Sequence, residues 1–569
     1  MKVPLSLATV LLLTLATVAS AQSIRDTPHN LSSGGTGSVR ATTENQVCVF
    51  CHATHNASAR APLWNRRDPG GSYTPYDSPS LKIKPGQPTG ASRLCLSCHD
   101  GTIAMGEVLS RTQAIAMSGG GFLPAGRTRL GQDLSDDHPI SFSYEASRAA
   151  RGTTLRVAPK TQGRPMVDAM GDMQCTSCHD PHDNSFGDFL RADPSSGGLC
   201  LKCHDETGWA ASAHATSSKS WNGAGNDPWE FSRFTDVSAN ACRSCHVQHG
   251  AKGRERLLTS DIEDDVCLVC HTGSVAAKNI GAEQTKWSSH GKSTTTLALG
   301  SETPPDGRKR AARCRACHNP HQANGNAASG RAVSGPLLGV AGLSSSGIAV
   351  ETSTYEFEVC YGCHSDDADV DPKRIRRVAD QANIRSRFDI GNASFHPIES
   401  SGKNPDVPSL KQPYTIGSMI TCTDCHDNDA GPAAGGTGPS GPHGSRWDYL
   451  LKYRYETQGQ VTESSAAYQL CYDCHERASI LADESFEEHR KHIVKEDTPC
   501  SACHDPHGVD RNRATGGDQT HLINFMESKV QPSSNGRLEF VDTGRFRGSC
   551  SLVCHGEDHK DESYSPGGK

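Results

Sequence analysis

Apolar residues are spread thinly along this chain, and their pattern predicts little regular structure. The one long apolar run, Leu5 to Val18, lies at the N-terminus. No other stretch approaches the roughly 18 apolar residues that a membrane-spanning helix needs. Only 35% of the 569 residues are hydrophobic, while 56 are glycine and 31 are proline. These apolar side chains are too few for several large hydrophobic cores, so we expect another component to fill the interior.

The N-terminal run has the layout of a secretory signal. Lys2 supplies a positive charge before it, and Ala19, Ser20 and Ala21 form a small-residue cleavage site. We therefore expect residues 1–21 to be a signal peptide and the mature chain to be exported, to the periplasm or the cell exterior. The alternative is an N-terminal membrane anchor, for which the run is short. The mature chain is predicted to have no membrane span.

All 24 cysteines occur in pairs, and a histidine directly follows each pair. Eleven pairs have the spacing C-x-x-C-H, and the last pair has one residue more. We number these motifs 1 to 12 in chain order: Cys48/Cys51/His52, Cys95/Cys98/His99, Cys175/Cys178/His179, Cys200/Cys203/His204, Cys242/Cys245/His246, Cys267/Cys270/His271, Cys314/Cys317/His318, Cys360/Cys363/His364, Cys422/Cys425/His426, Cys471/Cys474/His475, Cys500/Cys503/His504 and Cys550/Cys554/His555.

This pattern is the attachment signature of c-type haem. The two thiols form thioethers with the haem, and the adjacent histidine, here called the motif histidine, binds the iron. A disulfide scaffold or a set of zinc ribbons also uses cysteine pairs, but neither needs a histidine after every pair. The sequence therefore predicts twelve covalently attached haem c groups. The extra residue of motif 12 is expected to form a bulged loop.

The other fifteen histidines are enough to give each of twelve irons a second ligand. Methionine is the rival ligand, but only eight are present, including Met1. Ligation by two histidines places the potential lower than methionine–histidine ligation does. In motifs 1, 3, 5, 7 and 11 a further histidine follows three residues later. Two histidines three apart share one face of a helical turn, so the second is expected to bind a different haem. These five histidines are His55, His182, His249, His321 and His507.

Other candidate second ligands lie between the motifs. We predict this role for His138, His214, His290, His396 and His443. His443 is expected to replace the second histidine that motif 9 lacks. One member of each of two close pairs completes the set, and we take His492 rather than His489 and His521 rather than His559. His29 is ambiguous, since it is as well placed to bind a haem of its own chain as one of a neighbouring subunit.

The motifs group in twos, which predicts six di-haem modules, each with its own two second ligands. Their expected ranges are 22–160, 161–225, 226–300, 301–410, 411–495 and 496–569. The predicted fold is mostly irregular, with short α-helices around the motifs, little β-structure, and the chain wrapped around a haem array. The formal charge of −7 excludes a typical nucleic-acid binder, which is strongly basic.

Several segments give the chain a family resemblance. It resembles multihaem c-type cytochromes with paired C-x-x-C-H motifs, and is similar to cytochrome c3-like and extracellular filament cytochromes. The segments that carry the likeness are residues 47–57, 62–66, 94–102 and 138–142, with C-x-x-C-H-D-P-H at Cys175 and Cys500. The resemblance implies electron transfer to other redox proteins or to an extracellular acceptor, and allows self-assembly into filaments in which His29 crosses between subunits.

Two functions follow from these patterns. The first is a non-enzymatic dodecahaem cytochrome that transfers electrons along closely spaced, mostly bis-histidine haems in extracellular or periplasmic respiration. The alternative is a multihaem reductase of the nitrite, hydroxylamine or tetrathionate type, which needs one iron with an open position. His426, His475 and His555 are the motif histidines at which such a position would be sought first.

Overall fold

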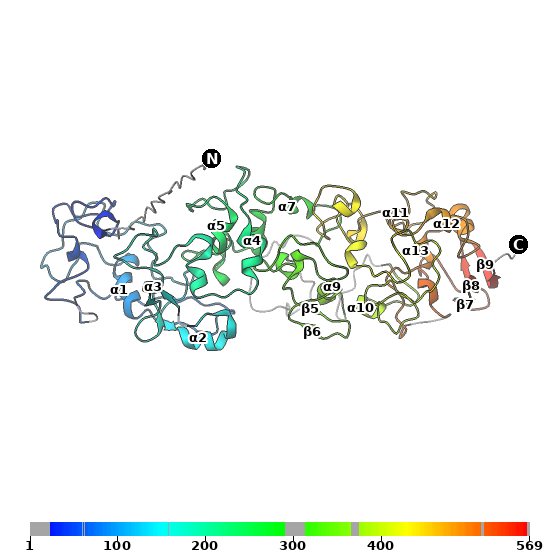
Figure 1. The fold of residues 1–569 in the computed structure, drawn as a ribbon, viewed down its shortest axis with the longest axis horizontal. Coiled ribbons are helices and arrows are strands. Elements are labelled where there is room, and N and C mark those ends of the chain that lie inside the picture. Colours follow the sequence, from blue (N-terminus) through cyan, green and yellow to red (C-terminus); the bar gives the residue numbers. More distant parts are fainter. Residues whose placement is uncertain are drawn as a thin grey trace, which may run out of the picture. The chain divides into compact units, whose positions relative to one another are not determined.

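Short helices and long irregular connections make up most of the chain (Figure 1). The structure is a computed structural model, and it describes residues 23–59, 61, 63–157, 159–290, 313–365, 375–513 and 517–565. The predicted signal peptide lies outside these residues. The expected fold class, mostly irregular with short helices at the motifs and little β-structure, is confirmed.

The longest helices are α1 (Gly90–His99), α9 (Glu356–His364) and α2 (Tyr144–Arg151), and α1 and α9 contain motifs 2 and 8. The remaining α-helices span four to six residues: α3 (Cys175–Cys178), α4 (Ala213–Thr216), α5 (Val237–Asn240), α6 (Glu263–Leu268), α7 (Ile280–Glu283), α8 (Cys314–Cys317), α10 (Ile384–Arg387), α11 (Gln469–Tyr472), α12 (Arg477–Leu481) and α13 (Cys500–Cys503).

Side chains at the N-termini of two helices explain where they begin. Ser143 precedes α2 and its Oγ accepts a hydrogen bond from the Ala146 amide. At α9, the Glu358 carboxylate accepts from the amides of Thr354 and Tyr355 at 2.7 and 3.0 Å. Both contacts satisfy amides that have no partner within the helix. The helix that carries motif 8 therefore starts where its own side chains cap it.

The strands form small antiparallel sheets. Only the C-terminal sheet, β7 (Glu539–Gly544), β8 (Arg547–Cys554) and β9 (Glu557–Tyr564), has three strands among the described residues, with β8 in the centre. The other strands are two residues long and pair as β1 (Phe142–Ser143) with β4 (Asp172–Met173), β2 (Lys160–Thr161) with β3 (Arg164–Pro165), and β5 (Gly342–Leu343) with β6 (Ala349–Val350).

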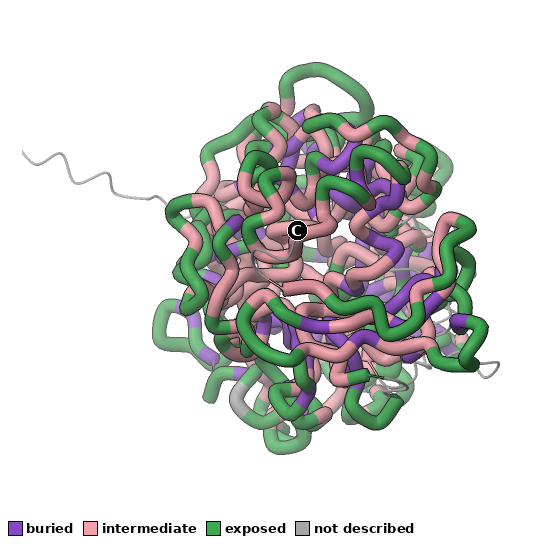
Figure 2. Tube along the Cα trace, turned by 90° about the vertical axis from the view of Figure 1, so that its right-hand side faces the viewer, coloured by how far each residue is buried: buried purple, intermediate pink, exposed green. Residues whose placement is uncertain are grey.

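Buried side chains form several small clusters instead of one large core. The first of them joins Phe357, Tyr361, Phe388, Phe395 and Ile398. Figure 2 shows the same pattern along the chain, with buried positions in short stretches between intermediate and exposed ones. Each cluster is too small to stabilise a domain of ordinary size by hydrophobic burial alone. This agrees with the expectation that another apolar component completes the interior.

Contacts divide the chain into two compact units, whose described residues fall in Met1–Asp205 with His246–Thr259, and in Glu206–Cys245 with Ser260–Lys569. The border at Asp205 lies inside the module predicted over residues 161–225. The six-module division stays a prediction. Among the described residues, no helix is both long enough and apolar enough to cross a bilayer.

Candidate haem sites

In motifs 1 to 11 the backbone turns between the two cysteines, as an α-helix or a 3-10 turn. The amide of the motif histidine commonly closes this turn, as where His52 donates to the Cys48 carbonyl at 2.8 Å and His504 to the Cys500 carbonyl at 2.9 Å. One turn therefore brings two thiols and an imidazole together, which is the arrangement that covalent haem attachment needs.

Motif 12 differs from the other eleven, and the prediction of a bulged loop is wrong. Cys550 and Cys554 both belong to strand β8, whose pairing shows only a register shift between Cys550 and Leu552. The strand is extended because β7 pairs with it on one side and β9 on the other. Residues four apart on a strand point to the same face, so both thiols still share one side of the sheet.

Cys363 of motif 8 and Cys48 of motif 1 are exposed, whereas the other motif cysteines are half-buried or buried. The exposure of Cys363 differs from the shielded position expected of a cofactor-binding thiol. Its cause is local, because Cys363 lies in the last turn of α9, beyond the residues that the helix buries, of which Tyr361 is the last. Cys360 lies three residues earlier on the same helical face, so the two thiols remain adjacent. Attachment at Cys363 stays a prediction.

All 24 cysteines are free of disulfides, which disfavours the disulfide scaffold. Burial raises the pKa of Cys178, Cys245 and Cys503 to about 12. Within the described part of the chain, one cluster of at least three potential ligands is close enough to hold a metal ion, and it contains only histidines. The zinc-ribbon alternative therefore finds no support.

Most motif histidines face a second imidazole at a regular distance. Two imidazoles on opposite sides of one metal have ring centroids about 6 Å apart, because each metal–nitrogen bond is about 2 Å long. Ten motif histidines match this spacing. The centroid distances are 6.1 Å for His52–His182, 6.3 Å for His99–His29, 6.3 Å for His179–His249, 6.4 Å for His204–His138, 6.3 Å for His271–His214, 5.9 Å for His318–His443, 6.4 Å for His364–His290, 6.0 Å for His426–His507, 6.5 Å for His504–His489 and 5.7 Å for His555–His492.

Three of the five histidines that follow a motif by three residues face a different motif, two positions earlier. His182 follows motif 3 and faces motif 1, and His249 follows motif 5 and faces motif 3. His507 follows motif 11 and faces motif 9. His443 faces motif 7 in the same way, so it occupies the place of the histidine that motif 9 lacks. Each of these pairs joins histidines from two different predicted modules. The geometry therefore differs from an arrangement in which each module supplies both of its own second histidines.

Backbone carbonyls orient many motif histidines. The Nδ1 of His99, His179 and His426 lies 2.7, 2.8 and 2.7 Å from the carbonyl oxygens of Thr128, Asp188 and Tyr449. A carbonyl can only accept, so Nδ1 carries the proton and Nε2 keeps its lone pair free for a metal. His246 is held in the same way by the Arg256 carbonyl, at 2.8 Å.

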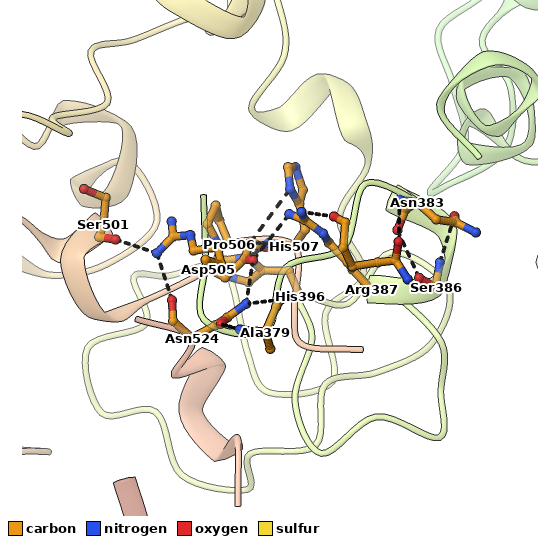
Figure 3. A network of polar contacts seen from close by, with 12 residues as sticks. Ala379, Asn383, Ser386, Arg387, His396, Ser501, Asp505, Pro506, His507 and Asn524 are labelled. Carbon is orange, nitrogen blue, oxygen red and sulfur yellow. Dashed lines mark hydrogen bonds and ion pairs between the residues drawn. The ribbon is translucent and has the colours of Figure 1, made fainter. Parts of the chain in front are cut away.

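A repeated contact orients four candidate second histidines, those near motifs 2, 6, 8 and 10. His29, His214 and His290 donate from Nδ1 to the carbonyls of Pro181, Pro320 and Pro442, at 3.3, 3.0 and 3.1 Å. His396 contacts the Pro506 carbonyl in the same manner (Figure 3). Each of these prolines directly precedes another predicted ligand, namely His182, His321, His443 and His507. One dipeptide therefore orients one imidazole and supplies a second.

The structure places His29 next to motif 2. Its ring stacks on Phe189 at 4.1 Å and faces His99 at 6.3 Å. Its contact with Pro181 follows the same rule as those of His214 and His290. His29 therefore lies beside motif 2 of its own chain, and its role as a second ligand stays a prediction.

His396 and His475 lie near each other. Burial lowers the pKa of His475 to about 4, and the neighbouring His396 contributes to the lowering. The Nδ1 of His475 is 3.0 Å from the Ser409 hydroxyl. Of the other predicted ligands, His321 packs against Trp209 with a centroid distance of 6.2 Å, and His55 is exposed.

The C-terminal histidines differ from the predicted choices. Both His489 and His492 face a motif histidine, where one of the two was expected. His521 does not take a ligand position, because its Nε2 is 3.0 Å from the Asp542 carboxylate and its Nδ1 is 3.1 Å from the Asn404 amide. His559, the alternative to His521, lies 5.8 Å from the His555 ring.

Four pairs of consecutive motifs, 2 and 3, 6 and 7, 8 and 9, and 10 and 11, are neighbours in space. The thiols of Cys95 and Cys175 share a hydrogen bond, as do those of Cys267 and Cys314. The same contact joins Cys360 to Cys422 and Cys471 to Cys500. In these four cases, the contact links the first cysteine of an even-numbered motif to the first cysteine of the next motif.

Two buried polar residues near the motifs were not predicted as functional, although Arg66 lies in the segment 62–66 that carries the family resemblance. Arg66 is fully buried and donates to the carbonyls of Ser97 and Met105, both at 2.9 Å, which ties the loop after motif 2 to that motif. Asp137 is 5% exposed, and its Oδ1 lies 3.0 Å from the Nδ1 of His249. A lone arginine or aspartate in an irregular segment has no periodicity from which its burial can be inferred.

Two segments match known families. Residues 234–389 match the family described as outer membrane cytochrome MtrC/MtrF-like, domains II/IV. Residues 168–208 match the doubled CXXCH motif family. No individual curated protein matches the chain. Both family matches overlap the paired motifs, the first covering motifs 5 to 8 and the second motifs 3 and 4.

Proposed function

This chain is a multihaem c-type cytochrome, and from that premise we propose that it is an exported electron-transfer protein with twelve haem c groups. Bound haem supplies one-electron redox chemistry at its iron. The chain itself supplies attachment, ligation, spacing and burial. Its partners are other redox proteins or an extracellular acceptor, consistent with the outer membrane cytochrome description of the matched family.

The observation that carries the proposal is the set of ten histidine pairs with centroids 5.7 to 6.5 Å apart. A surface histidine near a motif has no reason to face its motif histidine at this distance. The residues therefore fit a haem iron held between two imidazoles. We assign His396 to motif 10, because its Nδ1 contacts the Pro506 carbonyl in the manner of the other second histidines and His475 lies nearby.

Burial and hydrogen bonds prepare these imidazoles for iron. Burial lowers the pKa of His504 and His271 to about 4 and that of His489 to about 3. These rings are therefore neutral at physiological pH, as a ligand must be. Carbonyl contacts at Nδ1 make the imidazole a stronger donor, which favours the ferric state and a low potential.

The order of the motifs supports electron transfer along the chain. The first cysteines of motifs 2 and 3 and of motifs 6 and 7 lie side by side, and His182, His249 and His507, which follow a motif by three residues, reach the motif two positions earlier. These contacts hold attachment points close together and fix them relative to one another. A protein that only stored haem would need neither link.

The reductase alternative needs an iron without a second protein ligand. His426 and His555, two of the motif histidines suspected at first, each face another imidazole, and His396 lies beside His475. No described observation favours an open position, so electron transfer is the function that the geometry supports best.

Spectroscopy of the mature, haem-loaded protein tests this proposal. Intact mass gives the number of haems, for which we expect twelve. The ferric protein should show only low-spin electron paramagnetic resonance signals, and the reduced protein should not bind carbon monoxide. A high-spin signal or carbon monoxide binding in the untreated protein would favour the reductase instead. Electron microscopy of the same sample tests self-assembly, which stays a prediction.

A further inference from the structure

Three imidazoles meet at motif 12, where the other pairs have two. The ring centroids of His492 and His555 are 5.7 Å apart, those of His555 and His559 are 5.8 Å apart, and those of His492 and His559 are 6.3 Å apart. The three rings thus form a nearly equilateral triangle. By distance alone, His492 and His559 are equally suited to face the motif histidine across a metal ion.

Nitrogen atoms in this cluster are buried without hydrogen-bond partners. Both ring nitrogens of His555 and the Nε2 of His559 have none, and the Glu496 carboxylate stays 3.6 Å from the Nδ1 of His555. A buried polar atom without a partner is costly, and such atoms are usually satisfied by a group that binds there. The orphaned nitrogens therefore point to a shared ligand, and His492, His555 and His559 each offer a ligand atom within 4.8 Å of the others.

The two candidate ligands belong to different elements. His492 lies in a π-helical turn, Lys491–Lys495, and its Nδ1 is 2.8 Å from the Glu488 carbonyl. His559 lies on β9 and pairs with Leu552 of β8, the strand that carries motif 12. A helical turn and a sheet edge can shift independently, so the distances to His555 are not locked to each other.

We propose that His492 and His559 are alternative second ligands of the haem bound at motif 12. This inference rests on the proposed function, since it assumes that motif 12 carries a haem. In one state the iron is bonded to His492, and in the other that bond is broken and a bond to His559 replaces it. Both imidazoles are neutral donors, so the exchange moves no proton and no electron.

The two states differ in ligand strength. The Glu488 carbonyl accepts from Nδ1 of His492, which makes that imidazole the stronger donor and favours the ferric iron. Among the described residues, no carbonyl accepts from the Nδ1 of His559, whose buried Nε2 is the nitrogen left free to bind iron. The haem at motif 12 therefore has a lower potential with His492 and a higher one with His559. The last motif in the chain order thus carries a built-in adjustment of its redox level.

Single and double variants of the full-length, haem-loaded protein test this inference. We expect H492A and H559A each to keep twelve haems by intact mass and to stay entirely low-spin, because the other histidine takes over. We expect H492A/H559A to gain a high-spin ferric signal equal to one haem in twelve and to bind carbon monoxide. Added imidazole should return that haem to low spin, which shows that the site is intact. H521A is the matched control and should leave every signal unchanged.

Three results separate the possible failures. A high-spin haem in either single variant would show that the other histidine cannot substitute, and would overturn the inference. A double variant that stays fully low-spin would overturn it as well. A wild-type mass with eleven haems would instead contradict the proposed function at motif 12.

Discussion

The Nδ1 of His249 lies 3.0 Å from the Oδ1 of Asp137, a carboxylate that is almost fully buried. Most of the other second histidines whose Nδ1 contacts are described donate to backbone carbonyls. A carboxylate is a stronger acceptor than a carbonyl, so it makes the imidazole a better donor to a metal. Through His249, Asp137 therefore acts on the haem that we assign to motif 3.

Replacing this carboxylate should raise one potential. In D137N the acceptor loses its charge, which weakens the bond to His249 by about 1 kcal/mol. For a one-electron couple this corresponds to a rise on the order of tens of millivolts. A redox titration followed by absorbance should show that one haem in twelve has a higher reduction potential while the potentials of the rest are unchanged. The matched control D136N removes a neighbouring charge without touching His249, and an equal shift there would contradict this role for Asp137.

Removing a second ligand should open one iron. In H182A the ring that faces His52 at 6.1 Å is lost, so we expect one haem in twelve to become high-spin in the ferric protein. H521A removes a histidine whose nitrogens contact Asp542 and Asn404, and its spectrum should match the wild type. Electron paramagnetic resonance measures both. An unchanged H182A spectrum would mean that the His52–His182 pair does not hold an iron.

A buried ion pair near motif 11 should dominate local stability. Arg387 and Asp505 are 6% and 2% exposed and lie 3.3 Å apart (Figure 3). In R387M, Asp505 stays buried without its ion-pair partner, which costs about 3–5 kcal/mol in the free energy of unfolding. Urea denaturation measures this loss. R511M, which breaks the exposed pair with Asp389, should cost less than about 1 kcal/mol, and equal losses would contradict the argument.

The same carboxylate should make the protein sensitive to acid. Burial by itself raises the pKa of Asp505, but Arg387 and Arg377, with His507 also facing it, outweigh burial and hold the pKa below its usual value. A lowered folded-state pKa stabilises the fold above the unfolded pKa of about 4, and this contribution is lost as the pH falls through the folded value. D505N should therefore lose less stability than the wild type between about pH 5 and about pH 2. If the urea midpoints of the two proteins fall by the same amount as the pH is lowered, Asp505 contributes nothing to acid sensitivity.

The sequence predicted the parts of this protein that follow a local rule. Eleven of the twelve motifs share one spacing, and the low apolar content predicted short helices and small cores. Candidate second histidines could be named where they follow a motif or recur in similar short segments. Their partners could not, because the contact that orients His29 comes from Pro181, 152 residues away.

Other parts depend on contacts that have no local signature. His521 was expected to be a ligand, but Asp542 on β7 binds its ring. Motif 12 was expected to bulge, but pairing of β8 with two neighbours keeps it extended. Cys363 has the same motif spacing as its mostly half-buried counterparts, and its place at the end of α9 leaves it exposed. Asp137 acts through a histidine 112 residues away, and only the fold brings the two together.

A structure of the haem-loaded protein at a resolution that shows the iron ligands tests the central claim most directly. The account predicts that one iron lies between His52 and His182, one between His99 and His29, and one at each of the other pairs described above. An iron bound by its motif histidine alone at any of these pairs, or by a histidine from another pair, would contradict it.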